Sequence, residues 1–130
     1  MTRRIAWFVF VGCMAAAVHL GAVTLLVSQA GWHPLVANVF AWLLAFCVSF
    51  GGHWHLTFPH SGAPMLRAIR RFFLISLAGF ATNEVLYAAL LHAAGERWYL
   101  VILFFVLLAV AVMTWLLSSR WAFRGTGPAP

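Results

Sequence analysis

Two adjacent polar residues stand out in a long apolar run of this 130-residue chain. Asn83 and Glu84 lie at the middle of the segment from residue 69 to residue 91, which has the length and composition of a membrane-spanning helix. A carboxylate at the centre of a bilayer costs about 3 kcal/mol on insertion scales, so it is normally paired with another group or kept for a function. The pair predicts either a polar route through hydrocarbon or a hydrogen bond between helices.

Other apolar runs carry further isolated polar residues. His19 is expected near the bilayer centre, either as a partner of Glu84 or as a neutral histidine satisfied within the core. Asn38 lies near the opposite end of its run from Ser49, and it is expected to be structural. An interhelical hydrogen bond of this kind is worth about 0.6 kcal/mol in a membrane protein.

The composition requires these residues to be carried by membrane helices. Hydrophobic residues make up 65% of the chain and charged residues 8%, whereas a soluble domain carries about 25% charged residues. We therefore predict an all-α integral membrane four-helix bundle. Each helix is long enough to cross a core of about 30 Å, and the expected helices cover residues 5–28, 35–52, 69–91 and 99–117.

Basic residues are distributed unevenly between the two predicted sides of the membrane. Seven of the eight basic residues fall on the side of the two termini and the central loop. By the positive-inside rule this side is cytoplasmic, and its arginines would also bind anionic phospholipids. They flank helices instead of alternating with aromatic residues along a groove, so the net charge of +6 does not indicate a nucleic-acid partner.

The two halves of the sequence resemble each other in layout. In each half, basic residues precede an apolar helix with a polar centre, and a short turn containing tryptophan leads to a second helix with an aromatic-basic ending. A shift of 64 residues places His19 on Asn83. We therefore predict two parallel two-helix repeats, related by an axis along the membrane normal. Residues 125–130, rich in Gly and Pro, are expected to form a disordered tail.

Several short motifs resemble those of the GtrA-like family. They are Phe10-Val11-Gly12, His19-Leu20-Gly21, the helix exit from Trp54 to Phe58, Asn83, and the ending from Ser118 to Phe123. The residues that best match the exit motif, which is found twice, are Thr57, Phe58, Trp121 and Phe123. The chain departs from the family pattern at His19, where Asp is common, at His53, where Asn is usual, and at Leu56, where the first-half Trp is usual.

This resemblance implies a GtrA-like transmembrane domain over residues 1–124. The resemblance implies a four-helix bacterial inner-membrane protein of cell-surface polysaccharide synthesis. Members of the family are thought to translocate polyprenyl-phosphate-linked sugars. Related domains occur fused to, or beside, polyprenyl-phosphate glycosyltransferases, so such an enzyme is an expected partner. The polar route for the sugar would use Glu84, Asn83, His19, Asn38 and Ser49, and the phosphate would bind among Arg120, Arg4, Arg67, Arg70 and Arg71.

Other functions remain open at this point. The chain could be a non-transporting anchor for a membrane glycosyltransferase, or a small proton-coupled drug exporter with one buried carboxylate. It shows no nucleophile elbow, phosphate loop or paired carboxylates, so we expect no enzyme and no cofactor. The spacing of His53 and His55 does not predict a zinc site. Four short helices enclose little space for a sugar, so we expect a homodimer or a larger assembly.

Overall fold

The computed structural model describes residues 2–59, 62 and 64–121, and its side chains are described as far as residue 113. The predicted tail at 125–130 lies outside the described residues. Every secondary-structure element within them is a helix, and four helices are long and apolar enough to cross a membrane. The fold is the predicted all-α four-helix membrane bundle, and the protein is a multi-pass membrane protein.

The helices are somewhat longer than the sequence predicted. Helix α1 covers Thr2–Ser28, α2 covers Pro34–Gly52, α3 covers Met65–Ala94 and α4 covers Tyr99–Trp121. A short 3-10 helix, η2, spans Glu96–Trp98 before α4. Between α2 and the central loop lies a π-helical turn, η1, at His53–Thr57, directly after the end predicted for the second helix at residue 52. The backbone of η1 simply continues α2 beyond the Gly51-Gly52 pair.

Local residue chemistry explains the two short turns. Gly31 and Gly95 adopt positive φ values of 70° and 93°, which side chains with a Cβ rarely adopt. Pro34 occupies the first turn of α2, where its missing N–H is not needed. The Nδ1 atom of His33 accepts a hydrogen bond from the backbone N–H of Leu35 at 3.2 Å and so caps α2.

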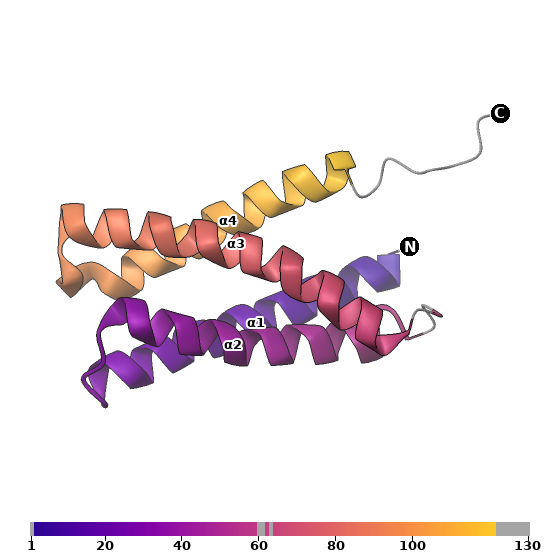
Figure 1. Ribbon diagram of the computed structural model, residues 1–130, viewed down its shortest axis with the longest axis horizontal. Coiled ribbons are helices and arrows are strands. Elements are labelled where there is room, and N and C mark those ends of the chain that lie inside the picture. The colour runs from indigo at the N-terminus through magenta and orange to yellow at the C-terminus, as the bar shows by residue number, and fades with distance from the viewer. Residues whose placement is uncertain (1, 60–61, 63, 122–130) are drawn as a thin grey trace.

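The two hairpins, α1–α2 and α3–α4, run in the same orientation (Figure 1). Both short turns lie at one end of the bundle, which we call the turn end. The N-terminus, the loop between α2 and α3, and the far end of α4 lie at the other, which we call the arginine end because it carries Arg3, Arg4, Arg67, Arg70 and Arg71. This is the arrangement that two parallel two-helix repeats require.

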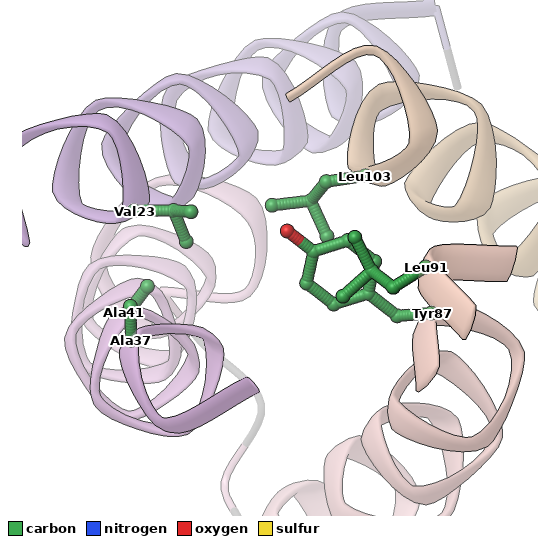
Figure 2. Packing of buried hydrophobic residues seen from close by; sticks show 6 residues of the cluster. All are labelled: Val23, Ala37, Ala41, Tyr87, Leu91 and Leu103. Atoms are coloured by element: carbon green, nitrogen blue, oxygen red, sulfur yellow. The ribbon is translucent and has the colours of Figure 1, made fainter. Parts of the chain in front are cut away.

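The buried core sits nearer the turn end. Val23, Tyr87, Leu91 and Leu103 come from α1, α3 and α4 and meet between the helices, with Ala37 and Ala41 of α2 beside them (Figure 2). Toward the arginine end, α2 and α3 are joined mainly by aromatic rings: Trp42 stacks on Phe80 at 4.5 Å between centroids, and Phe46 lies 5.4 Å from Phe73. Many large apolar side chains remain exposed, such as Leu25 and Val85, as expected where hydrocarbon is the solvent.

Candidate functional site

A chain of hydrogen bonds links three helices inside the bundle. The Nε2 atom of His19 in α1 lies 2.6 Å from the Oδ1 atom of Asn38 in α2. The Nδ2 atom of Asn38 donates to Oδ1 of Asn83 at 2.8 Å and to Oε2 of Glu84 at 2.6 Å, both in α3. We call these four residues the polar network. The structure thus brings together four of the five side chains that the sequence proposed for a sugar route.

Asn38 is the centre of the polar network, a position that the sequence did not predict for this residue near a helix end. Its side chain is fully buried, and its carbonyl and both amide hydrogens are used. Because Oδ1 of Asn38 can only accept, the Nε2 atom of His19 must be the donor. His19 therefore contacts Glu84 only indirectly, through Asn38. Its ring also has a hydrogen-bond partner within the core.

One donor of the polar network has no partner. The Nδ2 atom of Asn83 is buried and makes no hydrogen bond within the described residues, and the whole residue is 2% exposed. A buried donor left unsatisfied costs about 1–3 kcal/mol. Asn83 can therefore still donate to a further polar group, such as a water molecule or a hydroxyl, if one enters. Glu84 beside it is only half-buried.

The polar network lies closer to the turn end than the sequence predicted. Asn83 and Glu84 were expected at the middle of their helix, but α3 extends from Met65 to Ala94. Glu84 therefore lies ten residues, or about 15 Å, from the turn end of α3 and nineteen residues, or about 28 Å, from its other end. Asn38 lies within the first two turns of α2. Ser49 lies eleven residues further along α2, about 16 Å closer to the arginine end than Asn38. It is half-buried and does not join the network.

Apolar side chains close the polar network toward the turn end. Val23, Tyr87 and Leu103 are fully buried, and Val23 and Tyr87 lie one helical turn beyond His19 and Asn83 respectively. The hydroxyl of Tyr87 donates to the backbone carbonyl of Tyr99 at 3.1 Å, which ties α3 to the start of α4. We call Val23, Tyr87, Leu91 and Leu103 the apolar plug (Figure 2).

Beyond the apolar plug lies a hollow of about 520 Å³ at the turn end. Both hairpins line this hollow, which we call the turn-end hollow. Its walls include Val27, Trp32, His33, Glu96, Arg97 and Tyr99. The Nε2 atom of His33 lies 3.0 Å from Oε1 of Glu96, so the two turns contact each other across it. The sequence treated these turns only as connections with interfacial aromatic residues, and it did not predict that they face each other.

The arginines proposed for phosphate binding gather at the opposite end. Arg4, Arg67, Arg70 and Arg71 are all exposed, and the guanidinium of Arg4 lies 5.7 Å from the ring centroid of Phe58. Arg120 belongs to the last turn of α4, but its side chain is outside the described ones, as is that of Trp121. Phe123 lies outside the described residues. In the part of the chain that the structure describes, no cluster of three His, Cys, Asp or Glu side chains could hold a metal ion.

Comparison with protein families decides the membership of the chain. Residues 7–123 match the family model described as GtrA/DPMS, transmembrane domain. The chain belongs to this family. Comparison with curated proteins and with solved structures gives no significant match. At the level of the family, this GtrA/DPMS member is a membrane protein of glycan synthesis, and such proteins are generally non-catalytic.

The first exit motif of this GtrA/DPMS domain is part of the contact between α1 and the end of α2. Thr57 is buried within η1, and its Oγ1 atom lies 3.0 Å from Nδ1 of His53. The His53 ring stacks on Phe8 of α1 with 4.8 Å between centroids. Phe58, exposed, ends the π-helical turn with its N–H bonded to the carbonyl of His53. The motif therefore holds Phe58, the residue after η1, beside the guanidinium of Arg4.

Proposed function

We propose that the protein is a translocase, or the membrane subunit of one, for polyprenyl-phosphate-linked sugars in cell-surface glycan synthesis. One observation carries the proposal. A carboxylate, two amides and an imidazole are gathered inside a membrane bundle, with one buried amide donor left unused. Family membership in glycan synthesis gives the class of solute that these groups would meet.

The proposal assigns different work to the two ends of the bundle. Glu84 would accept hydrogen bonds from sugar hydroxyls, and the free amide of Asn83 would donate to a hydroxyl oxygen. His19 and Asn38 would hold these two side chains in position. At the arginine end, Arg4, Arg67, Arg70, Arg71 and Arg120 would bind the phosphate, because a guanidinium stays charged and can bond two phosphate oxygens at once.

The charge distribution supports an orientation. Seven of the eight basic residues lie outside the two short turns in the sequence. By the positive-inside rule this distribution supports a cytoplasmic arginine end, with both termini in the cytoplasm of a bacterial inner membrane. The phosphate would then bind where a lipid-linked sugar is made, and anionic phospholipids would contact the same arginines. The turn end would face outward.

The described conformation is closed under this proposal. The apolar plug lies between the polar network and the turn-end hollow, and Asn83 is only 2% exposed. Translocation therefore requires the α3–α4 hairpin to move relative to α1–α2. We propose that a homodimer or a larger assembly provides the remaining wall of the route, and that a glycosyltransferase, not this chain, performs the chemistry.

A second candidate function is a membrane anchor for a polyprenyl-phosphate glycosyltransferase. The tight closure of the polar network favours this candidate, because buried hydrogen bonds can simply hold helices together. Association with such an enzyme, combined with no translocation by the purified protein, would support the anchor and contradict the translocase.

The decisive experiment replaces Glu84 without removing its hydrogen bond. In Glu84→Gln the amide oxygen can still accept from Asn38, so helix packing should persist while the carboxylate is lost. We expect translocation of a fluorescent polyprenyl-phosphate sugar in liposomes to fall at least tenfold, with unchanged protein abundance.

The matched control is Ser76→Ala. It removes a hydrogen bond between the same two helices, from Nε1 of Trp42 to Oγ of Ser76 at 2.9 Å, but leaves the polar network intact. Translocation should survive this change. If Glu84→Gln transports as well as the unaltered protein, or if both variants lose activity equally, Glu84 has no role in the route.

A further inference from the structure

The two short turns together form a surface that neither hairpin has alone. Trp32 and His33 come from the first turn, and Glu96, Arg97 and Tyr99 come from the second turn and the start of α4. They line the turn-end hollow, a largely open depression with a volume of about 520 Å³. Aromatic rings with a few convergent polar groups are the usual lining of small-molecule sites.

The geometry fixes what His33 and Glu96 present to a ligand. Because Nδ1 of His33 accepts the N–H of Leu35, the ring proton must be on Nε2, which then donates to Oε1 of Glu96 at 3.0 Å. The capping contact therefore holds the carboxylate in place without requiring a charged imidazole. The Glu96 side chain is 62% exposed, so its other oxygen remains accessible as an acceptor.

The aromatic residues of the hollow are also held in position. The ring of Trp32 is 37% exposed and packs edge-on against Phe40 at 5.1 Å between centroids. The guanidinium of Arg97 lies 5.1 Å from the ring centroid of Trp98. The indole of Trp32 offers an apolar face, and the same hollow is lined by the carboxylate of Glu96, which accepts hydrogen bonds, and the guanidinium of Arg97, which donates them.

This combination matches a saccharide, which has apolar C–H faces and hydroxyl groups that both donate and accept. We infer that the turn-end hollow is a second binding site, separate from the polar network, for the saccharide head of a lipid-linked sugar. Trp32 contacts the apolar face of the sugar. Glu96 accepts hydrogen bonds from the sugar hydroxyls, and Arg97 donates hydrogen bonds to the ring or hydroxyl oxygens. The identity of the ligand rests on the proposed function, whereas the site itself rests on the lining of the hollow.

The position of the hollow gives the second site its role. The apolar plug separates it from Asn83 and Glu84, so a sugar bound there has already passed the plug or has not yet entered it. Tyr99 lines the hollow, and its backbone carbonyl accepts a hydrogen bond from the hydroxyl of Tyr87, which belongs to the plug. Occupancy of the hollow can thus act on the plug through the contact between α3 and α4.

The test measures occupancy at equilibrium and does not depend on transport. The full-length protein is labelled with fluorotryptophan and placed in phosphatidylcholine nanodiscs, and the Trp32 signal is assigned with Trp32→Phe. The probe is citronellyl-phosphoglucose, and citronellyl phosphate without a sugar serves as the control ligand. We expect the sugar-bearing probe to shift the Trp32 fluorine resonance in a saturable way and the control ligand to leave it unchanged.

Two substitutions separate this site from the polar network. Glu96→Ala should weaken the response of Trp32 at least tenfold, whereas Glu84→Gln should leave it unaltered. An equal response to the sugar-free phosphate would show a headgroup-phosphate site and overturn the saccharide assignment. Absence of any shift, or full retention of the response in Glu96→Ala, would also overturn it. Because the measurement is independent of translocation, transport without a Trp32 response would refute this inference and leave the proposed function standing.

Discussion

The α1–α2 and α3–α4 hairpins share an orientation but differ in how closely their helices pack. Near the arginine end, α1 approaches α2 so closely that a Cβ atom on Gly52 would lie 2.7 Å from a methyl carbon of Val11. A Cβ on Gly79 of α3 would meet Val110 of α4 only at 3.9 Å, an ordinary contact distance. Helices α3 and α4 also diverge from their turn toward the arginine end (Figure 1).

The difference indicates a division of labour between two similar repeats. The α1–α2 hairpin is closed along its length and carries His19 and Asn38, joined by their own hydrogen bond. The α3–α4 hairpin diverges toward the arginine end and supplies Asn83 and Glu84 (Figure 1). Rearrangement is therefore easier in the second hairpin, while the first provides a fixed surface. The polar network connects the two hairpins inside the bundle, in addition to the Trp42–Ser76 hydrogen bond and the His33–Glu96 contact.

The largest expected effect comes from removing the centre of the polar network. Asn38→Leu keeps a similar volume but leaves His19, Asn83 and Glu84 without their shared partner. Each buried polar group that loses its partner costs about 1–3 kcal/mol, so we expect a loss of about 3 kcal/mol in the free energy of unfolding. Unfolding in mixed detergent micelles, followed by circular dichroism, measures it. Ser49→Ala on the same helix should change stability by less than about 0.6 kcal/mol, and similar losses in both variants would contradict the central role of Asn38.

The next effect tests the close packing of the first hairpin. Gly52→Ala forces the new methyl group against Val11, and overpacking of this kind costs about 1–3 kcal/mol. Gly51→Ala is the matched control, because nothing lies within 4 Å of the Cβ position there. The same unfolding measurement should show a loss for Gly52→Ala and none for Gly51→Ala. Equal stability of the two variants would show that α1 and α2 are less closely packed at this end.

The smallest effect should have the opposite sign and lies in the second hairpin. Gly79→Ala places a methyl group at ordinary contact distance from Val110 and replaces the residue that most disfavours a helix interior apart from proline. We expect a gain of up to about 1 kcal/mol. If opening of α3 against α4 is needed for translocation, the same variant should transport more slowly despite its greater stability. A destabilised Gly79→Ala would mean that the two hairpins are equally closed.

The sequence predicted the fold well because apolar runs of membrane-spanning length leave few alternatives. It also selected Asn83, Glu84, His19 and Asn38, since polar residues within such runs are conspicuous. It placed Asn38 near a helix end, as observed, but it gave no sign that two other helices converge on this residue. Nor did the sequence indicate how closely α1 approaches Gly52. The close contact of Gly52 with Val11 depends on how α1 and α2 cross, and this cannot be read from the residue pattern of either helix.

The meeting of the two turns was beyond sequence reasoning for the same reason. His33 and Glu96 are far apart in the chain, and each by itself is an ordinary polar residue at an interface. The second helix was predicted to end at residue 52, but helical backbone continues through η1 to Thr57. Within η1 the side chains of His53 and Thr57 come close enough for Nδ1 and Oγ1 to lie 3.0 Å apart.

The hydrogen bond between His19 and Asn38 has a consequence for biogenesis. Both residues precede the central loop, so this contact can form as soon as the first two segments leave the translocon. At that stage both amide hydrogens of Asn38 face lipid tails without an acceptor, and only the arrival of the third segment satisfies them. The first two helices thus present a pair of hydrogen-bond donors that the third helix must match with its own acceptors. A chain that stalls before residue 83 would expose an unmet polar group, which membrane quality-control proteases could recognise.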